Sequence, residues 1–403
     1  MKKILACLLV GLCANPLSAA TTVEWWQFWT DAAIKPVIEE IVTDFEKQNP
    51  DIDIKVTDLT WANGHEKIAI AFASKTAPDI VELGSDWIAQ FAVNGQLANI
   101  SASIANDSTE FQGWGMATWN NGVYAAPWIL GTRVLYGNRN LLTRAGYPPN
   151  FLPVTWAELK EASIKIRALD KNIYGWGSNT AEKHRLYKKF LPFFWSNNAQ
   201  FFTDDGLLCV LPSTKGIEAL RLYKDLHDSA GYVADQRGIE DAFLDGKVGF
   251  IFSGDWLLKR IELENRKINF FTTLVPGPKF PGRSFLGGEF LAVSEQSGHK
   301  DEAMKFIRFL TSPEQQVKFC KANRSANPSS KTAQKDDYFS GNSHLQMFIR
   351  QILSSNYPPV DPDWVVMEDF IERAVEDALF GSGNCAQALL DAKRKIEQVR
   401  SRK

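Results

Sequence analysis

Cysteine is scarce in this chain, and its scarcity excludes a scaffold built on disulfides. The 403 residues include 5 cysteines, and Cys7 and Cys13 fall in the N-terminal segment described below. Cys209, Cys320 and Cys385 remain, and three cysteines can form one disulfide at most. A small secreted domain held together mainly by disulfides is therefore excluded.

Long apolar runs and a strong charge of one sign are also missing. After residue 20, no uninterrupted apolar stretch approaches the ~18 residues that a membrane-spanning helix needs, so we expect no membrane insertion. Lys and Arg number 45 against 47 Asp and Glu, which gives a formal net charge of −2. This balance argues against nucleic acid as the main partner.

Recognised catalytic and metal-binding motifs are absent. The chain has no Gly-x-Ser-x-Gly, no Walker loop and no His-Glu-x-x-His, and its 5 histidines are scattered. Neighbouring acids such as Asp204-Asp205 are typical of solvated turns. We therefore expect no enzyme, no cofactor and no metal.

The first 20 residues have the pattern of a secretory signal peptide. Lys2 and Lys3 precede an apolar run from Ile4 to Cys13, and Ser18-Ala19-Ala20 supplies small residues for cleavage. Neither cysteine in this segment has the small-residue context of a lipid-modified cysteine. We expect the mature chain to begin at Thr21 and to be exported to the periplasm.

The remaining length suits two domains of roughly 150–200 residues each. Strand patterns at Val23–Phe28, Ile52–Val56 and Asp79–Leu83 alternate with helical patterns, the first of them at about Ala33–Gln48. Such alternation predicts parallel sheets with helices on both faces.

Two segments in different halves of the chain share one pattern. A buried strand, Ile80–Leu83, leads into Gly84-Ser85-Asp86-Trp87, and another, Val248–Phe252, leads into Ser253-Gly254-Asp255-Trp256. In open parallel sheets, ligands bind at the carboxyl ends of strands, where helix N-termini point free N–H groups. A carboxylate beside an indole ring suits a sugar hydroxyl and a sugar face. We expect the two ends to form opposite walls of one cleft, although chance is the alternative, since Asp363-Trp364 follows no strand.

Further motifs occur in an order that is typical of one protein family. Over nearly the whole mature chain, this order resembles the solute-binding proteins of ATP-binding-cassette (ABC) sugar importers, the group that includes maltose-binding protein. The motifs are Ala77–Val81, Gly95–Leu97, Asn121–Trp128, Thr132–Tyr136, Ala145-Gly146 with Thr155-Trp156, Gly246–Val248 with Gly254–Trp256, Gly287-Gly288 with Phe290–Val293, and Phe309–Glu314.

The resemblance implies a two-lobed α/β fold of the periplasmic-binding-protein type, in which each lobe is a mostly parallel sheet flanked by helices. It implies a monomeric periplasmic protein that captures a mono- or oligosaccharide in the cleft between the lobes and delivers it to the transmembrane subunits of an ABC permease. Three hinge crossings are expected near residues 127–132, 276–278 and 323–328, with a first lobe of 21–128 plus 278–324 and a second of 132–275 plus 330–403.

The chain departs from the family pattern at two places near the expected cleft or hinges. Asn323–Pro328 stands where members often carry a Gly-rich, proline-containing stretch, and Gly131 stands where close relatives tend to have an acidic residue. The identity of the ligand therefore does not carry over. A binder of glycerol phosphate or another anionic polyol, held by Arg133 or Arg324, stays open as an alternative.

The chain is rich in aromatic residues, with 13 Trp, and some of them are candidates for stacking on a sugar. Burial in the hydrophobic cores is the competing explanation for each indole, and capping of a helix N-terminus is the competing explanation for each Asp. A secreted carbohydrate-active enzyme is a less favoured alternative, because Asp86 and Asp255 could approach each other on closure. The expected ligand contacts are Trp29, Asp86, Trp87, Trp128, Asp255, Trp256 and Glu289.

Overall fold

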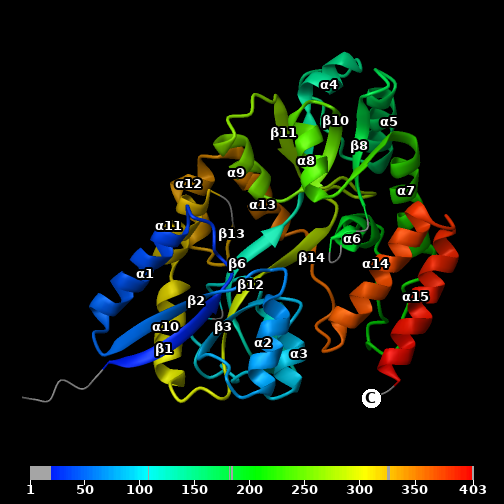
Figure 1. The fold of residues 1–403 in the computed structure, drawn as a ribbon. Helices are drawn as coiled ribbons and strands as arrows, with labels where there is room; N and C mark the ends of the chain where they lie inside the picture. The colour runs from blue at the N-terminus through cyan, green and yellow to red at the C-terminus, as the bar shows by residue number, and fades with distance from the viewer. Residues whose placement is uncertain (1–19, 108, 181, 183–184, 325–326, 402–403) are drawn as a thin grey trace, which may run out of the picture.

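The computed structural model describes residues 20–107, 109–180, 182, 185–324 and 327–401, and Figure 1 shows two lobes, each built on its own sheet. The predicted signal peptide lies, apart from Ala20, outside these residues. Within the described part of the chain, no helix is both long and apolar enough to cross a bilayer.

The sheet of the first lobe has the strand order β13-β6-β12-β3-β1-β2, and β14 pairs with β12. Helices α1, α2, α3, α10, α11 and α12 belong to this lobe, as does the short hairpin of β4 and β5. The strands are β1 (Thr21–Gln27), β2 (Ile52–Asp58), β3 (Ile80–Gly84), β4 (Thr118–Trp119), β5 (Gly122–Val123), β6 (Ala126–Thr132), β12 (Ser284–Val293), β13 (Asn327–Pro328) and β14 (Ser355–Asn356). The helices are α1 (Lys35–Gln48), α2 (Gly64–Ala73), α3 (Ile88–Val93), α10 (Lys300–Leu310), α11 (Pro313–Asn323) and α12 (Asp337–Ser340).

The sheet of the second lobe has the strand order β11-β7-β10-β8-β9. Its strands are β7 (Val134–Asn138), β8 (Tyr174–Asn179), β9 (Gly231–Ala234), β10 (Val248–Ser253) and β11 (Phe270–Thr273). The remaining helices are α4 (Arg139–Arg144), α5 (Trp156–Arg167), α6 (Leu186–Ser196), α7 (Thr214–Ala230), α8 (Gln236–Leu244), α9 (Trp256–Leu263), α13 (Ser343–Ile352), α14 (Trp364–Phe380) and α15 (Cys385–Arg400).

Both sheets are mixed, which corrects the expectation that they are mostly parallel. In the first sheet β1 runs parallel to β2 and β3, but β12 runs antiparallel to β3 and β6. In the second sheet β10 runs parallel to β8 and antiparallel to β7. The antiparallel pairings arise where strands connect the lobes, because β6 continues almost directly into β7 and β12 returns from the other lobe.

Sequence patterns explain several of these elements. In α1, Ile38, Ile41, Val42 and Phe45 are buried along one face, as their helical spacing requires. Helix α5 begins with the predicted capping box, in which the Thr155 hydroxyl accepts from the N–H of Glu158 and the Glu158 carboxylate accepts from the N–H of Thr155. Hydrophobic clusters lie around each sheet.

Three chain segments meet where the lobes join: the β6–β7 junction, the start of β12, and β14. The Thr132 hydroxyl donates to the carbonyl of Phe285 at 2.7 Å, and the Ser284 hydroxyl donates to the carbonyl of Arg133 at 2.7 Å. Ser284 also pairs with Ser355 of β14. Short polar side chains thus hold the crossing strands side by side.

The segment after β13 lies on a different lobe from the one that the sequence indicated. Residues 330–339 were assigned to the second lobe, yet the Thr332 N–H donates to Glu110 at 3.0 Å and Phe339 is buried in a core of the first lobe. The Ser329 hydroxyl likewise donates to the carbonyl of Pro127 at 2.7 Å. A polar, irregular sequence suggested a hinge near residues 323–328, but β13 pairs with β6 there and the chain stays on the first lobe as far as Phe339.

Candidate functional site

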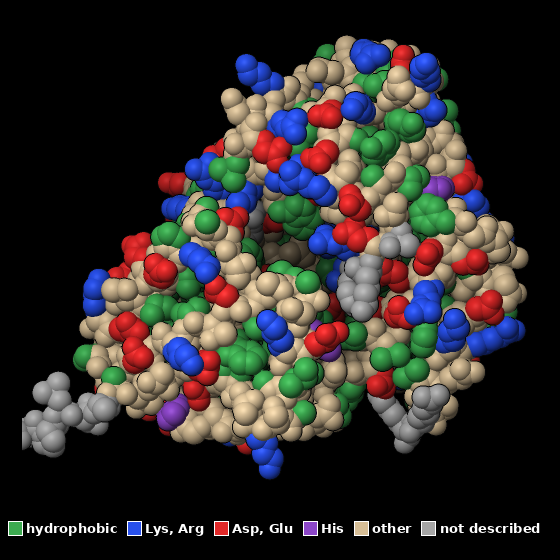
Figure 2. Space-filling model, in the orientation of Figure 1, with side chains coloured by type: hydrophobic (Ala, Val, Ile, Leu, Met, Phe, Trp, Pro, Cys, Tyr) green, Lys and Arg blue, Asp and Glu red, His purple; other side chains and the backbone are tan. Residues whose placement is uncertain are grey.

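Figure 2 shows a hollow between the lobes near its centre, and the two Asp-Trp segments lie where the lobes meet, since each carboxylate bonds a residue of the opposite lobe. Asp86 follows β3 in the first lobe, and Asp255 follows β10 in the second. Glu289 of β12 lies near both: burial raises its pKa to about 8, and the negative charges of Asp255 and Asp86 add to that rise. The register explains the position of Glu289, which pairs with Gly84 at the end of β3.

Asp86 joins the lobes through an ion pair. Its Oδ2 accepts from Nζ of Lys188, on α6 of the second lobe, at 3.3 Å, and both side chains are largely covered. Helix α3 begins at Ile88, and Trp87 is its N-cap residue. Asp86 therefore does not cap this helix, which was the alternative explanation for it. The carboxylate faces the other lobe instead.

Asp255 also reaches across the lobes. It occupies the N-cap position of α9, but its side chain makes no capping hydrogen bond there. Its Oδ2 accepts from Nδ2 of Asn327, on β13 of the first lobe, at 2.9 Å, and the residue is 6% exposed. Both strand-end carboxylates are therefore tied to the opposite lobe.

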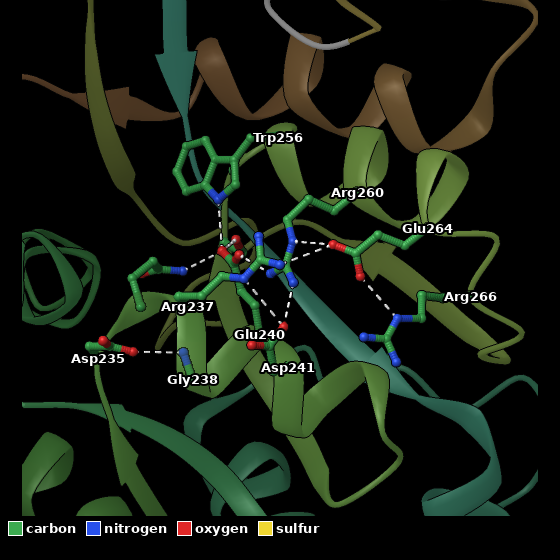
Figure 3. Close-up of polar contacts among 12 residues, drawn as sticks. Asp235, Arg237, Gly238, Glu240, Asp241, Trp256, Arg260, Glu264 and Arg266 are labelled. Atoms are coloured by element: carbon green, nitrogen blue, oxygen red, sulfur yellow. Dashed lines mark hydrogen bonds and ion pairs between the residues drawn. The ribbon is translucent and has the colours of Figure 1, made fainter. Parts of the chain in front are cut away.

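Trp256 is held by a buried carboxylate that the sequence did not single out (Figure 3). Its Nε1 donates to Oε1 of Glu240 at 2.7 Å, and Glu240 is 2% exposed. The same carboxylate accepts from the Ser253 hydroxyl and from Nη1 of Arg260, each at 2.8 Å. Arg260 pairs in turn with Glu264. The indole N–H edge is thus fixed, which sets the orientation of the ring.

Arg133 lies between the lobes beside Trp256. Its guanidinium carbon is 5.6 Å from the centre of the Trp256 ring and 4.7 Å from that of Phe285, which are cation–π distances. Burial, with the charge of Arg185 nearby, lowers the pKa of Arg133 to about 10, so it is charged at neutral pH.

The structure corrects the prediction that Trp128 contacts the ligand, because this residue lies in the core and not on the cleft. It is 0% exposed and packs against Trp25 and Phe319, with ring centres 5.9 and 4.8 Å away. Strand β6 is covered on both edges, by β13 and β12, and its burial is continuous around this residue. Because apolar residues do not alternate with polar ones along this strand, the sequence does not show which side of the sheet each side chain faces.

The other two predicted indoles pack against the hydrophobic clusters of the first lobe. Trp29 is partly exposed and packs edge-on against Phe319 at 4.9 Å. Trp87 is partly exposed and lies in an aromatic cluster with Phe28 and Trp61. The role of both indoles as ligand contacts stays a prediction.

Trp61 is a candidate that the sequence analysis missed. It is 50% exposed and stacks on Phe28 with ring centres 4.3 Å apart. It lies in the loop after β2, at the carboxyl end of a strand that runs parallel to β1. Its position directly after an alternating strand was the available signal.

A second buried carboxyl group lies beneath Glu289. Glu82 of β3 is 0% exposed, and its Oε2 accepts from the N–H of Phe28 at 3.0 Å. Burial, with the nearby Glu289, raises the pKa of Glu82 well above its usual range. Among the described residues, no group of three His, Cys, Asp or Glu side chains is placed to hold a metal ion.

The raised pKa of Glu289 predicts a pH-dependent stability. The unfolded carboxyl ionises near pH 4.5 and the folded one near pH 8, so the free energy of unfolding should fall as pH rises between these values. Glu289→Gln removes this loss, which is on the order of 5 kcal/mol. Thermal unfolding should show equal stability of wild type and variant near pH ~4, and a more stable variant near pH ~9.

The control for this experiment is Glu295→Gln, which changes a half-exposed carboxylate paired with Lys300. Its stability difference from the wild type should be small at every pH, because exposed pairs contribute little. A Glu289→Gln difference that does not grow with pH would contradict the assignment.

Comparison with known proteins places this geometry in a family. The family model described as bacterial extracellular solute-binding protein matches residues 29–317. A putative binding protein of Brucella abortus (strain 2308) is 27% identical over 378 residues, covering 90% of each chain. The diacetylchitobiose binding protein DasA of Streptomyces coelicolor is 26% identical over 351 residues, covering 82% of this chain and 78% of that protein.

Solved structures show the same fold. The sugar-binding protein MalE from Xanthomonas citri superposes with a TM-score of 0.84 at 24% identity, covering 95% of this chain and 98% of that chain. The cyclic alpha-maltosyl-1,6-maltose binding protein from Arthrobacter globiformis also has a TM-score of 0.84, at 22% identity, covering 94% and 99%. Because the family model covers well over half of its length, the chain belongs to the bacterial extracellular solute-binding proteins.

Proposed function

We propose that this protein captures a mono- or oligosaccharide between its two lobes and delivers it to the transmembrane subunits of an ABC importer. The observation that carries the proposal is that Asp86 and Glu289 from one lobe lie close to Asp255, the neighbour of Trp256, from the other, where the lobes meet. Relatives named for diacetylchitobiose and for maltooligosaccharide support a carbohydrate as the ligand class.

The ligand contacts that we propose combine hydrogen bonds and ring stacking. Asp86, Asp255 and Glu289 would bond sugar hydroxyls, and Trp256 would cover an apolar sugar face. Trp61 and Trp87 are further stacking candidates at the first lobe, and Trp29 is less accessible than Trp61.

Closure of the lobes would couple binding to delivery. A ligand that touches both lobes only in the closed form shifts the equilibrium toward that form. The moving bodies would be residues 21–128 with the segment from about 284 to 341, and residues 134–275 with the C-terminal helices. Bending would occur at Thr132–Arg133, at Ser284–Phe285 and at β14, where the chain crosses between the lobes.

The setting that fits this role is the periplasm. The signal-peptide pattern of residues 1–20 and membership of an extracellular family support export with cleavage near Ala20. We further propose that the protein acts as a monomer and as a carrier without catalytic activity.

The test is a thermal-shift screen of the mature protein against neutral and acidic sugars, polyols and phosphorylated polyols. Binding to the folded form alone stabilises it by about 4 kcal/mol at a 1,000-fold excess of ligand over Kd. A sugar should therefore raise the Tm clearly, and it should change the tryptophan fluorescence. Stabilisation by a non-sugar solute, with no sugar active at millimolar concentration, would refute the proposal.

A turnover assay on the sugar that binds distinguishes a carrier protein from a carbohydrate-active enzyme. The proposal expects that sugar to be recovered intact after long incubation. Hydrolysis that Asp86→Asn or Asp255→Asn abolishes would establish the enzyme instead.

A further inference from the structure

Arg133 differs from the cationic side chains near it, because among the described residues its guanidinium has neither a carboxylate at ion-pair distance nor a hydrogen-bond acceptor. Each of its cationic neighbours has an acceptor. Lys189 donates to the carbonyl of Phe252 at 2.5 Å. Lys188 pairs with Asp86 at 3.3 Å, and Arg185 pairs with Glu182 at 2.9 Å.

The surroundings of Arg133 are aromatic and poor in acceptors. Its guanidinium faces the rings of Phe285 and Trp256, and its Nε is buried without a hydrogen-bond partner. Aromatic faces attract a cation but do not satisfy its N–H donors, and a covered charge without a partner is costly. The side chain as a whole is only partly covered, so it can still meet a ligand.

The wall beside Arg133 has room for a ligand group. Gly131 precedes Arg133 by two positions in an extended stretch, so the two residues point to the same side. A Cβ added at Gly131 would meet nothing within 4 Å, and its φ is not in the left-handed region. Because the two residues share one side of the extended stretch, we expect this space to lie next to the Arg133 side chain, and a Cβ at position 131 causes no clash.

We propose that Arg133 binds an anionic group of the ligand, so that the captured carbohydrate is an acidic sugar carrying a carboxylate, sulfate or phosphate group. This inference rests on the proposed function. The sugar ring would stack on Trp256, and its anionic group would receive two parallel N–H bonds from the guanidinium, the geometry that arginine favours.

The nearby acidic residues do not neutralise the positive charge of Arg133. The Asp86 carboxylate is paired with Lys188 and Asp255 accepts from Asn327, so each of these acids already has a partner other than Arg133. Glu289, with a pKa of about 8, is mainly protonated at neutral pH and adds little negative charge. The guanidinium therefore remains the cation best placed to receive a ligand anion.

The test is calorimetric titration of the mature protein with matched sugars. The pairs are glucose with glucuronate, galactose with galacturonate, and glucose with its 6-phosphate and its 6-sulfate, together with the corresponding disaccharides. At least one acidic member should bind ten-fold or more tightly than its neutral counterpart, and the members that do so identify the anion. Arg133→Gln should remove the preference, and Arg133→Lys should restore part of it.

A second variant tests the same site without changing Arg133. Gly131→Glu supplies an internal carboxylate beside the guanidinium and should weaken the acidic sugar at least ten-fold while leaving its neutral counterpart nearly unchanged. Gly131→Gln has the same size without the charge and should keep the preference. An unchanged Tm would show that each variant is folded.

The outcomes separate this inference from the function on which it rests. Neutral sugars that bind as tightly as their acidic counterparts, or a preference that survives in Arg133→Gln, would overturn the inference and leave carbohydrate binding intact. Failure of every sugar in the panel, with glycerol 3-phosphate binding instead, would overturn the proposed function and this inference together.

Discussion

Trp128→Ala is expected to destabilise the protein by about 3–5 kcal/mol, the usual cost of removing a large aromatic side chain from a core. Trp128 is 0% exposed and is surrounded by Trp25, Trp29 and Phe319. It lies on β6 between two paired strands, so the structure cannot collapse easily into the space left behind. Urea unfolding followed by far-UV circular dichroism measures the loss as a lower midpoint with little change in slope.

Trp61→Ala is the matched control, because it removes the same side chain from a half-exposed position. Its cost should be well below that of Trp128→Ala, and Trp128→Phe should fall between them because it preserves part of the packing. If the Trp128→Ala protein were as stable as the Trp61→Ala protein but no longer bound its sugar, Trp128 would be a ligand contact and not a core residue.

Local patterns predicted the elements and the strand ends. The helical spacing of Ile38, Ile41 and Phe45 fixed the buried face of α1, and the Thr155–Glu158 pair fixed the start of α5. Asp86 and Asp255 were found because a buried strand followed by a small-residue turn is recognisable within ten residues of sequence. These features depend on neighbours along the chain, and sequence contains that information directly.

The errors concern contacts between residues far apart in the chain. Nothing local distinguishes Glu240 from the other acids of its helix, because its partner Trp256 belongs to another element. The strand pattern around Trp128 is apolar at nearly every position, so it does not assign a face. Residues 330–339 are polar like a hinge, yet Glu110 fixes them to the first lobe through side-chain and backbone bonds.

The largest expected effect on binding comes from Trp256→Ala. We expect the affinity for the sugar to fall by about 100-fold, which corresponds to ~2.8 kcal/mol. The ring offers a large apolar face, and its orientation is set in advance by the bond to Glu240, so little freedom is lost on binding. Calorimetric titration with the sugar found in the thermal-shift screen measures the change.

Variants of Trp256 and of Glu240 distinguish the contribution of the ring from that of the carboxylate that orients it. Trp256→Phe retains an aromatic face but loses the N–H, so a ten-fold weakening is expected, while Glu240→Gln retains a neutral acceptor and should bind nearly as well as the wild type. In Glu240→Ala the Trp256 N–H, the Ser253 hydroxyl and part of Arg260 lose a buried acceptor, so both stability and affinity should fall. If Trp256→Ala bound the sugar as tightly as the wild type, stacking on the second lobe would be refuted, and the apolar contact would have to come from Trp61 and Trp87 on the first.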